Sequence, residues 1–326
     1  MSNRQLPTLQ GNTQPDTSTP SRTTTGQRIF EYAQMDVFAE SALEGNMLAV
    51  FTDARGLTSE EMQALARETN LAETTFIIPR DAEIERERGV QVRIFTTQEE
   101  LPFAGHPTLG TASWLWWQHA TLRGAQEIRL DLKVGQIPVR FTQPESGSVG
   151  VFAEMQQRDP EFLAVHDREA VAAALGLPAE DISDAMPVQT VSTGMAFCIV
   201  PLRSLAVAAR LSIARERSEQ YLAAHGSKFF YCITPTAAGS GADWHARMQF
   251  YGTEDPATGS AAGCAIAYLV RHGAVASGQR IVIEQGIEIK RPSRIYAHAK
   301  VLDSKVCEVR VGGRTMHVAS GRFFLS

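Results

Sequence analysis

Residues 28–70, which follow the N-terminal tail, change from a two-residue apolar period to a helical one. Residues 28–38 and 47–51 are aromatic and apolar with rough alternation, and the Glu44–Asn46 turn separates them. This pattern predicts two strands joined by a loop. Thr58 precedes a glutamate by three residues and opens an apolar helical pattern, so we expect a capped helix that ends near Asn70.

A second helical pattern lies between further strands. Ala112–Ala120 is apolar on nearly every side, which is typical of a helix enclosed within a core. The charged Glu83–Arg88 segment predicts a turn, and the sequence PESGS at Pro144–Ser148 predicts a domain boundary. The β-branched and aromatic stretches predict strands at 74–78, 91–96, 128–141, 197–200, 229–233 and 247–251, and from residue 280 to the end. Further helices are expected at 169–175 and 205–214.

A seven-residue motif occurs twice in the chain. His106–Ala112 reads HPTLGTA and Asp255–Ala261 reads DPATGSA, so the two copies agree at three positions and are similar at a fourth. Each copy follows an arginine-containing strand and an acidic turn, and each precedes an apolar helix. This shared order predicts two halves of one architecture. We therefore expect an α+β fold of two similar lobes, each a curved, mostly antiparallel sheet wrapped around a central helix, with the active site in the cleft between them.

Both motifs are predicted to lie at helix N-termini. Such a terminus offers unpaired N–H groups and a partial positive charge, which suits a substrate carboxylate. Glycines around the motifs are expected to let a ligand approach the backbone; they are Gly105, Gly110, Gly259 and Gly263. His106 and Asp255 would then lie on opposite walls of the cleft, where they can transfer protons. A structural role is the alternative, since histidine can satisfy a buried carbonyl and Asp before Pro is an ordinary helix cap.

Composition and charge exclude several classes of partner. The formal net charge is -5, and the lysines and arginines are scattered, which argues against nucleic-acid binding. The longest apolar run, Ala261–Val270, is shorter than the roughly 20 residues that a membrane span needs. The four cysteines are far apart and have no histidines at ligand spacing, so we expect buried thiols and no metal site.

Residues 1–27 are rich in Thr, Ser, Gln and Pro and contain almost nothing apolar to bury. This composition predicts a disordered tail. Because the tail lacks the apolar region of a secretory signal, we expect a cytoplasmic protein.

Five stretches of sequence carry a resemblance to a known family. They are MDVFAESALEGNMLAVF (35–51), RETNLAETTFI (67–77), RIFTTQEELPFAGHPTLGTA (93–112), YGTEDPATGSAAG (251–263) and EQGIEIKRPS (284–293). On these stretches the chain resembles the PhzF family, which comprises the phenazine-biosynthesis isomerase and its relatives and shares the fold of diaminopimelate epimerase. With the predicted boundary, the two lobes span 28–145 and 146–326, and the last strand is free to return to the first lobe.

The resemblance implies which residues are catalytic. It identifies Glu73 as the acid and base that moves a proton between carbons of the substrate, helped by His106 and Asp255. The last two occupy the positions of the cysteine pair in the epimerases. Partial desolvation is expected to raise the pKa of Glu73 toward neutrality, so that one group can take and return a proton.

The resemblance also implies how the substrate is held. Backbone groups at Gly105 and Gly259, with the Ser260 hydroxyl, would bind its carboxylate and neighbouring polar groups. Ala72 stands where the family has a serine, so a hydroxyl at the substrate-binding position is missing. This departure bears on the identity of the substrate more than on the reaction type. Cys264 does not match the epimerase cysteine, which argues against thiol-based racemisation.

The expected activity is a cofactor-independent isomerisation of a small cyclic carboxylate. The resemblance favours trans-2,3-dihydro-3-hydroxyanthranilate, as in phenazine biosynthesis, with Glu73 moving a proton from C3 to C1. One alternative is a racemase or epimerase of another amino or hydroxy acid in secondary metabolism. Another is a small-molecule-binding module without turnover. The family relation also implies a homodimer that needs no metal or organic cofactor.

Overall fold

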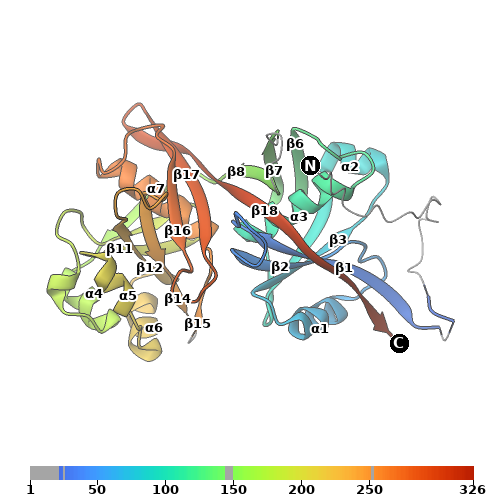
Figure 1. The fold of residues 1–326 in the computed structure, drawn as a ribbon, viewed down its shortest axis with the longest axis horizontal. Helices are drawn as coiled ribbons and strands as arrows, with labels where there is room; N and C mark the ends of the chain where they lie inside the picture. Colours follow the sequence, from blue (N-terminus) through green and yellow to red (C-terminus); the bar gives the residue numbers. More distant parts are fainter. Residues whose placement is uncertain (1–21, 25, 144–149, 251–252) are drawn as a thin grey trace, which may run out of the picture.

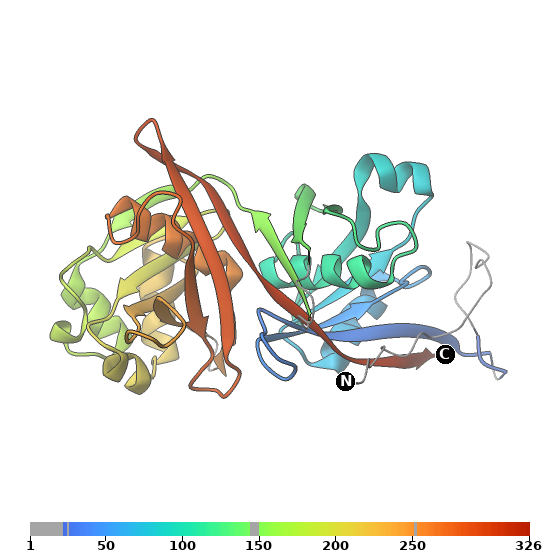
Figure 2. The same ribbon diagram turned by 45° about the horizontal axis from the view of Figure 1, so that its top comes forward.

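The computed structural model describes residues 22–24, 26–143, 150–250 and 253–326. Two lobes lie side by side, and one long strand, β18 (Lys305–Leu325), runs from one lobe into the other (Figures 1 and 2). Most of the predicted tail lies outside the described residues, and so does the predicted boundary at 144–148. The division into 28–145 and 146–326 therefore stays a prediction.

The first lobe is a ring of strands around a helix. Its other strands are β1 (Arg28–Val37), β2 (Asn46–Phe51), β3 (Glu73–Ile78), β4 (Val90–Phe95), β5 (Glu100–Leu101), β6 (Glu127–Leu132), β7 (Gly135–Thr142) and β8 (Val151–Gln156). The ring closes because β18 pairs with both β8 and β1, so among the described residues every strand of the ring has a neighbour on both sides, and only β5 pairs on one side, with β4. Helix α3 (Gly105–Gln118) packs against most of these strands, and 10 of its 14 residues are buried. The helices α1 (Ser59–Thr69) and α2 (Ala82–Arg88) lie outside the ring.

In the second lobe an open sheet, which ends at β9, curves around helix α7 (Gly259–Arg271), of whose 13 residues 11 are buried. Its strands are β9 (Glu161–Val165), β10 (Gln189–Ser192), β11 (Ala196–Pro201), β12 (Phe229–Pro235), β13 (Trp244–Arg247), β16 (Ile281–Gln285) and β17 (Ser293–Leu302). The last of these, β17, pairs with β18. The remaining elements are the hairpin of β14 (Gln249–Phe250) and β15 (Thr253–Glu254), α4 (Arg168–Leu175), the short helix η1 (Ala179–Asp181), α5 (Leu205–Arg210) and α6 (Arg215–Ala224). The helices α4, α5 and α6 cover a second apolar cluster on the outer side of this sheet.

Strand directions confirm that the lobes repeat one architecture. In the first lobe the neighbours β1–β2, β2–β3, β3–β4, β4–β6 and β6–β7 pair antiparallel, parallel, antiparallel, parallel and antiparallel. In the second lobe β10–β11, β11–β12, β12–β13, β13–β16 and β16–β17 follow the same order. The predicted α+β fold of two similar lobes, each built around a central helix, is thus confirmed.

The helix boundaries show which elements the local sequence pattern predicted correctly. Thr58 caps α1 in a capping box with Glu61, and Asn70 ends the helix in the left-handed conformation, as predicted. The predicted turn at Glu83–Arg88 is wrong, because these residues form most of α2. That helix buries none of its side chains, so it has no apolar period to recognise. Within the described part of the chain, no helix has the length and apolar character needed to cross a bilayer.

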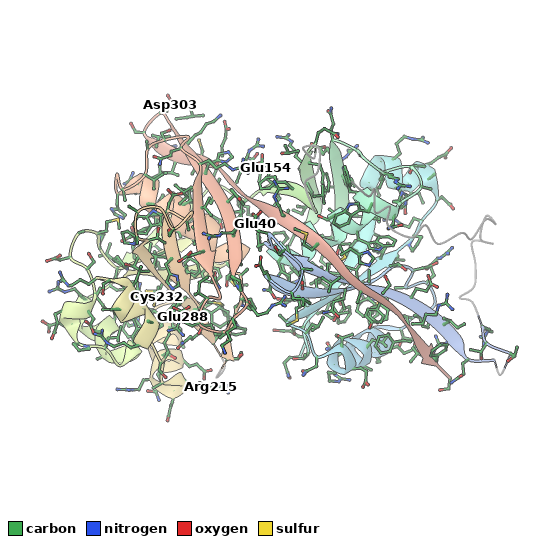
Figure 3. All side chains as sticks on the ribbon, viewed as in Figure 1. Glu40, Glu154, Arg215, Cys232, Glu288 and Asp303 are labelled. Atoms are coloured by element: carbon green, nitrogen blue, oxygen red, sulfur yellow. The ribbon has the colours of Figure 1, made fainter. Side chains whose placement is uncertain are left out.

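Hydrogen bonds and ion pairs join the lobes where β18 passes between them. Arg291 donates to Asp36 Oδ1 at 2.9 Å, and the Gly45 N–H donates to the carbonyl of Pro292 at 2.8 Å. The Tyr296 hydroxyl donates to Glu40 at 3.0 Å, and Figure 3 places Glu40 at this junction. The segment 286–292 of the second lobe is therefore fixed to the β1–β2 loop of the first.

Candidate active site

Three residues predicted to be catalytic lie together at the junction of the lobes. Glu73 is the first residue of β3, His106 is the second residue of α3, and Asp255 directly follows β15. The Nε2 atom of His106 lies 3.3 Å from Glu73 Oε2. The amide nitrogen of Asn46 lies 2.8 Å from Asp255 Oδ1 and 3.4 Å from His106 Nδ1. The first lobe thus supplies Glu73 and His106, and the second supplies Asp255.

Burial controls the protonation of Glu73. Its side chain is 18% exposed. Desolvation, with a smaller contribution from the negative charge of Asp255, raises the pKa of Glu73 from its ordinary 4.5 to about 8. The Oε2 atom is buried and has no hydrogen-bond partner among the described residues. At neutral pH most molecules therefore carry a protonated, uncharged Glu73.

Unlike Glu73, His106 and Asp255 are both mostly deprotonated at pH 7. Burial lowers the pKa of His106 to about 3, against a hydrogen bond to the Met47 backbone, so its ring is neutral at pH 7. Burial raises the pKa of Asp255 to about 6, against hydrogen bonds from the Thr258 hydroxyl at 2.6 Å and the Asn46 amide. Asp255 is then mostly ionised at pH 7. Titratable groups with separated pKa values are typical of acid–base sites.

The N-termini of the two central helices meet beside these side chains. A methyl group added to Gly105 would lie 3.6 Å from the backbone nitrogen of Ser260 and 3.8 Å from Gly259. Neither helix has a side-chain N-cap. Among the described residues, no hydrogen bond occupies the N–H groups of Gly105, Gly259 or Ser260, or the Ser260 hydroxyl. The junction therefore combines two partial positive charges with free donors, which favours an anion.

Two glycines expected to admit a ligand instead allow close packing, so that part of the prediction is wrong. A methyl group on Gly110 would lie 2.6 Å from the Leu48 side chain. One on Gly263 would lie 1.9 Å from Gln157, which donates to the Gly259 carbonyl at 2.9 Å. Both glycines bring a central helix close to its neighbours.

Other predicted residues lie nearby or elsewhere. Ala72 is exposed and immediately precedes Glu73. Cys264 is buried within α7, 3.4 Å from the Thr193 hydroxyl, and burial raises its thiol pKa to about 11. Cys198 and Cys232 are also buried, whereas Cys307 is only partly buried, contrary to prediction. No group of three or more potential metal ligands occurs among the described residues.

Sequence reasoning missed the residues that hold Asp255. Asn46 was interpreted only as part of a turn. Gln285 donates to the Asp255 carbonyl at 2.8 Å and to the Thr258 hydroxyl at 2.9 Å, and it accepts from Tyr231 at 3.1 Å. The only available signal for Gln285 was its position in the EQG stretch that carries the family resemblance.

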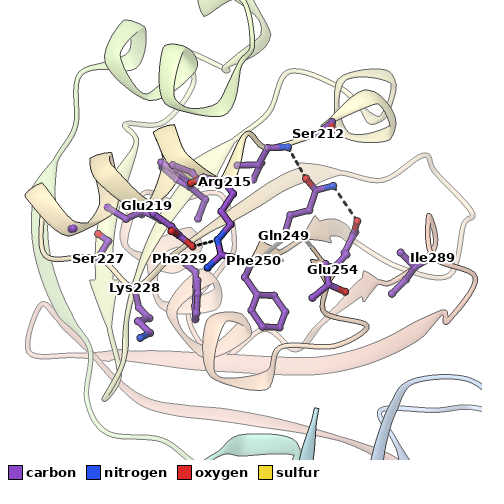
Figure 4. Close-up of a pocket in the computed structure, with 16 residues that line it drawn as sticks. Ser212, Arg215, Glu219, Ser227, Lys228, Phe229, Gln249, Phe250, Glu254 and Ile289 are labelled. Carbon is purple, nitrogen blue, oxygen red and sulfur yellow. Dashed lines mark hydrogen bonds and ion pairs between the residues drawn. The ribbon is translucent and has the colours of Figure 1, made fainter. Parts of the chain in front are cut away.

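A separate cavity of about 700 Å³ lies in the second lobe (Figure 4). Side chains of α6, of residues 227–230 and of the β14–β15 hairpin line it. Glu254 faces this cavity and accepts from Gln249 at 3.1 Å. Glu73, His106 and Asp255 do not line the cavity, so its size gives no measure of the catalytic site.

Comparisons with known proteins agree with the fold and with the resemblance. The family model of phenazine biosynthesis-like proteins, PhzC-PhzF, matches residues 35–321. The trans-2,3-dihydro-3-hydroxyanthranilate isomerase of Pseudomonas aeruginosa is 36% identical over 305 residues, which cover 91% of this chain and 100% of that protein. A PhzF-family phenazine biosynthesis protein from Bacillus anthracis superposes with a TM-score of 0.80 at 25% identity, covering 91% of this chain and 99% of that one.

The fold extends to more distant proteins. A hydroxyproline epimerase from Agrobacterium vitis superposes with a TM-score of 0.58 at 10% identity, covering 91% of this chain and 93% of that one. This likeness concerns the fold alone. The match to the family model and the 36% identity to a named isomerase show the closer relation. The chain belongs to the PhzC-PhzF family of phenazine biosynthesis-like proteins and is an isomerase.

Proposed function

We propose that this isomerase converts trans-2,3-dihydro-3-hydroxyanthranilate, with Glu73 as the group that moves the proton. The facing pair of Glu73 Oε2 and His106 Nε2 carries this proposal. Both atoms are buried, both lack a hydrogen-bond partner among the described residues, and they lie 3.3 Å apart. Buried polar atoms without partners cost free energy, so their retention marks a place built for a ligand.

The two helix N-termini supply the proposed carboxylate site. Gly105, Gly259 and Ser260 present free backbone donors next to one another, and the Ser260 hydroxyl adds a further donor. A carboxylate bound there lies beside Glu73 and Asp255. Because Glu73 and Asp255 are largely shielded from water, the bound acid would lie in a low-dielectric site, where electrostatic interactions with the reacting groups are strong.

The proposed reaction balances without a cofactor. Glu73 in its ionised form removes the proton from C3, and the electron pair moves through the conjugated system to C1. The same carboxylic acid returns the proton to C1, and the enol left at C3 tautomerises to a ketone as its O–H proton is lost and the neighbouring ring carbon gains one. His106 Nε2 faces the Glu73 carboxyl at 3.3 Å, while the charge of Asp255 disfavours permanent ionisation of Glu73. No electron is gained or lost, so no redox group is needed.

The test is turnover of this compound in deuterated water by the wild type and by Glu73→Gln. Glutamine cannot accept the proton, and loss of a general base lowers kcat by roughly 10²- to 10⁴-fold. Glu68→Gln, an exposed glutamate on α1, is the matched control and should keep full activity. Full activity of a folded Glu73→Gln variant would reject the mechanism, and lack of turnover by the wild type would reject the substrate.

Ala72 favours one second candidate, a racemase or epimerase of another amino or hydroxy acid. The exposed methyl group before Glu73 cannot donate the hydrogen bond expected of the family serine. Screening such acids for solvent deuterium at Cα separates the two activities. A module without turnover would instead bind a carboxylate tightly in calorimetry and form no product.

The family relation also supports a homodimer as a proposal. Sedimentation equilibrium would give a mass of twice 35.6 kDa for the dimer. A mass of one chain at micromolar concentration would reject it.

A further inference from the structure

Asn46 connects the two lobes at the centre of the site. It is the first residue of β2, and it is 1% exposed. Its amide nitrogen lies 2.8 Å from Asp255 Oδ1 and 2.9 Å from the Ala257 carbonyl oxygen, both in the second lobe. The same nitrogen lies 3.4 Å from His106 Nδ1 in the first lobe. One side chain thus contacts two groups of the proton-transfer site that are far apart in sequence.

The geometry determines how the Asn46 amide is used. A primary amide has two N–H groups, and the two oxygen acceptors at 2.8 and 2.9 Å take both of them. The reverse orientation of the amide would place its oxygen against a carboxylate and a carbonyl, which repel it. His106 Nδ1 therefore receives no proton from Asn46.

Asp255 is fixed from both sides. Asn46 donates to its Oδ1 atom, and the Thr258 hydroxyl donates to Oδ2 at 2.6 Å. These bonds favour the carboxylate, whereas burial and the nearby charge of Glu254 disfavour it. The other titratable groups that interact with Asp255 are Glu73 on β3 and Tyr231 on β12.

We infer that Asn46 is a positioning residue, which holds Asp255 as an oriented carboxylate across the junction of the lobes. This inference rests on the proposed function of the site, because it concerns the same proton transfer. Asn46 acts through its neighbours and need not touch the substrate.

Asn46→Asp tests this role with little change in volume. The new carboxylate removes the donor and adds a negative charge beside Asp255, so the pKa of Asp255 should rise by about one unit or more. Titration of 13C-labelled aspartate carboxyls measures this shift, with Asp255→Asn used to assign the signal. We also expect kcat to fall at least about tenfold with a smaller change in KM, since bound substrate no longer meets an oriented acid–base set.

Gln136→Glu is the matched control. It makes the same amide-to-carboxylate change at an exposed site where the amide donates to a backbone carbonyl, that of Glu87, at 3.0 Å. It should leave the Asp255 titration and kcat unchanged. A purely structural role of Asn46 would lower stability without moving that titration, and an unmoved titration in folded Asn46→Asp would overturn the inference.

A measurement on the wild type covers the case in which the variant does not fold. The 15N shift of the Asn46 side-chain amide should follow the titration of the Asp255 carboxyl, because one of its N–H groups is bonded to Asp255 Oδ1. An amide shift that does not follow this titration would overturn the inference. Neither spectroscopic measurement needs a substrate, so failure of the proposed reaction is distinguishable from failure of the role of Asn46.

Discussion

Replacing Glu73 by glutamine is expected to stabilise the fold, by an amount that grows with pH. Burial raises the pKa of Glu73 from 4.5 to about 8, so between these values the folded chain keeps a proton that the unfolded chain releases. Stability must then fall as pH rises through this window, because the folded state binds more protons than the unfolded state. Glutamine resembles the protonated acid and does not titrate, so it removes this dependence.

The size of the effect follows from the two pKa values. One pKa unit corresponds to about 1.4 kcal/mol, so Glu73 lowers the free energy of unfolding by about 1 kcal/mol at pH 5 and about 3 kcal/mol at pH 7. The advantage of Glu73→Gln over the wild type should therefore increase by about 2 kcal/mol between these two pH values. Other titrating groups contribute equally to both proteins and cancel in this difference.

Urea unfolding of both proteins at pH 5 and pH 7 measures this increase in stability directly. The exposed Glu68→Gln control should change the free energy of unfolding by less than about 0.5 kcal/mol at both pH values. If the advantage of Glu73→Gln is the same at both, Glu73 does not titrate near pH 8 in the folded protein. Burial would then not hold Glu73 as a neutral acid at pH 7.

Three further outcomes follow from the structure. If ionised Glu73 is the base, kcat/KM should rise about tenfold per pH unit up to about pH 8, and a profile flat from pH 6 to 8 would contradict that role. Arg247→Met breaks an ion pair whose two side chains are each 6% exposed and should lower the free energy of unfolding by about 3–5 kcal/mol in urea titrations. Arg93→Met should cost less, because its glutamate partner is also paired with a lysine. Gly45→Ala should lower the melting temperature more than Gly124→Ala, since both have positive φ but only the first places a methyl group 2.3 Å from a backbone oxygen.

Much of the fold could be predicted because it depends on neighbours in sequence. The capping box at Thr58 and the left-handed Asn70 are local, and both lie where the pattern placed them. Helix α3 begins at Gly105, before the apolar run at Ala112. The pattern did not show this early start because Gly-His-Pro is also typical of a turn. Proline within the first turn costs no intrahelical bond, so the helix tolerates Pro107 there.

The site was less accessible to sequence reasoning because it depends on long-range contacts. Glu73 lies between a helix end and a strand, where a glutamate is most often solvated, and only the family resemblance identified it. Asn46 and Asp255 are 209 residues apart, and no local pattern contains their 2.8 Å contact. The repeat placed an arginine-containing strand and an acidic turn before each motif, and the structure adds a contact between them that was not predicted. Arg93 pairs with Glu100 and Arg247 with Glu254, so each arginine-containing strand is joined to the acidic turn after it.

The same repeat explains why the proposed proton-transfer group lies on one side only. Arg93 is opposite Phe76 in the β3–β4 ladder, and Arg247 is opposite Cys232 in the β12–β13 ladder. Three residues before these partners lie Glu73 and Phe229, which are the equivalent first residues of β3 and β12. One lobe therefore presents a carboxyl group where the other presents a phenyl ring. A single base on one face of the substrate can return a proton to the face from which it came. This arrangement suits a proton shift between two carbons better than inversion of configuration at one carbon.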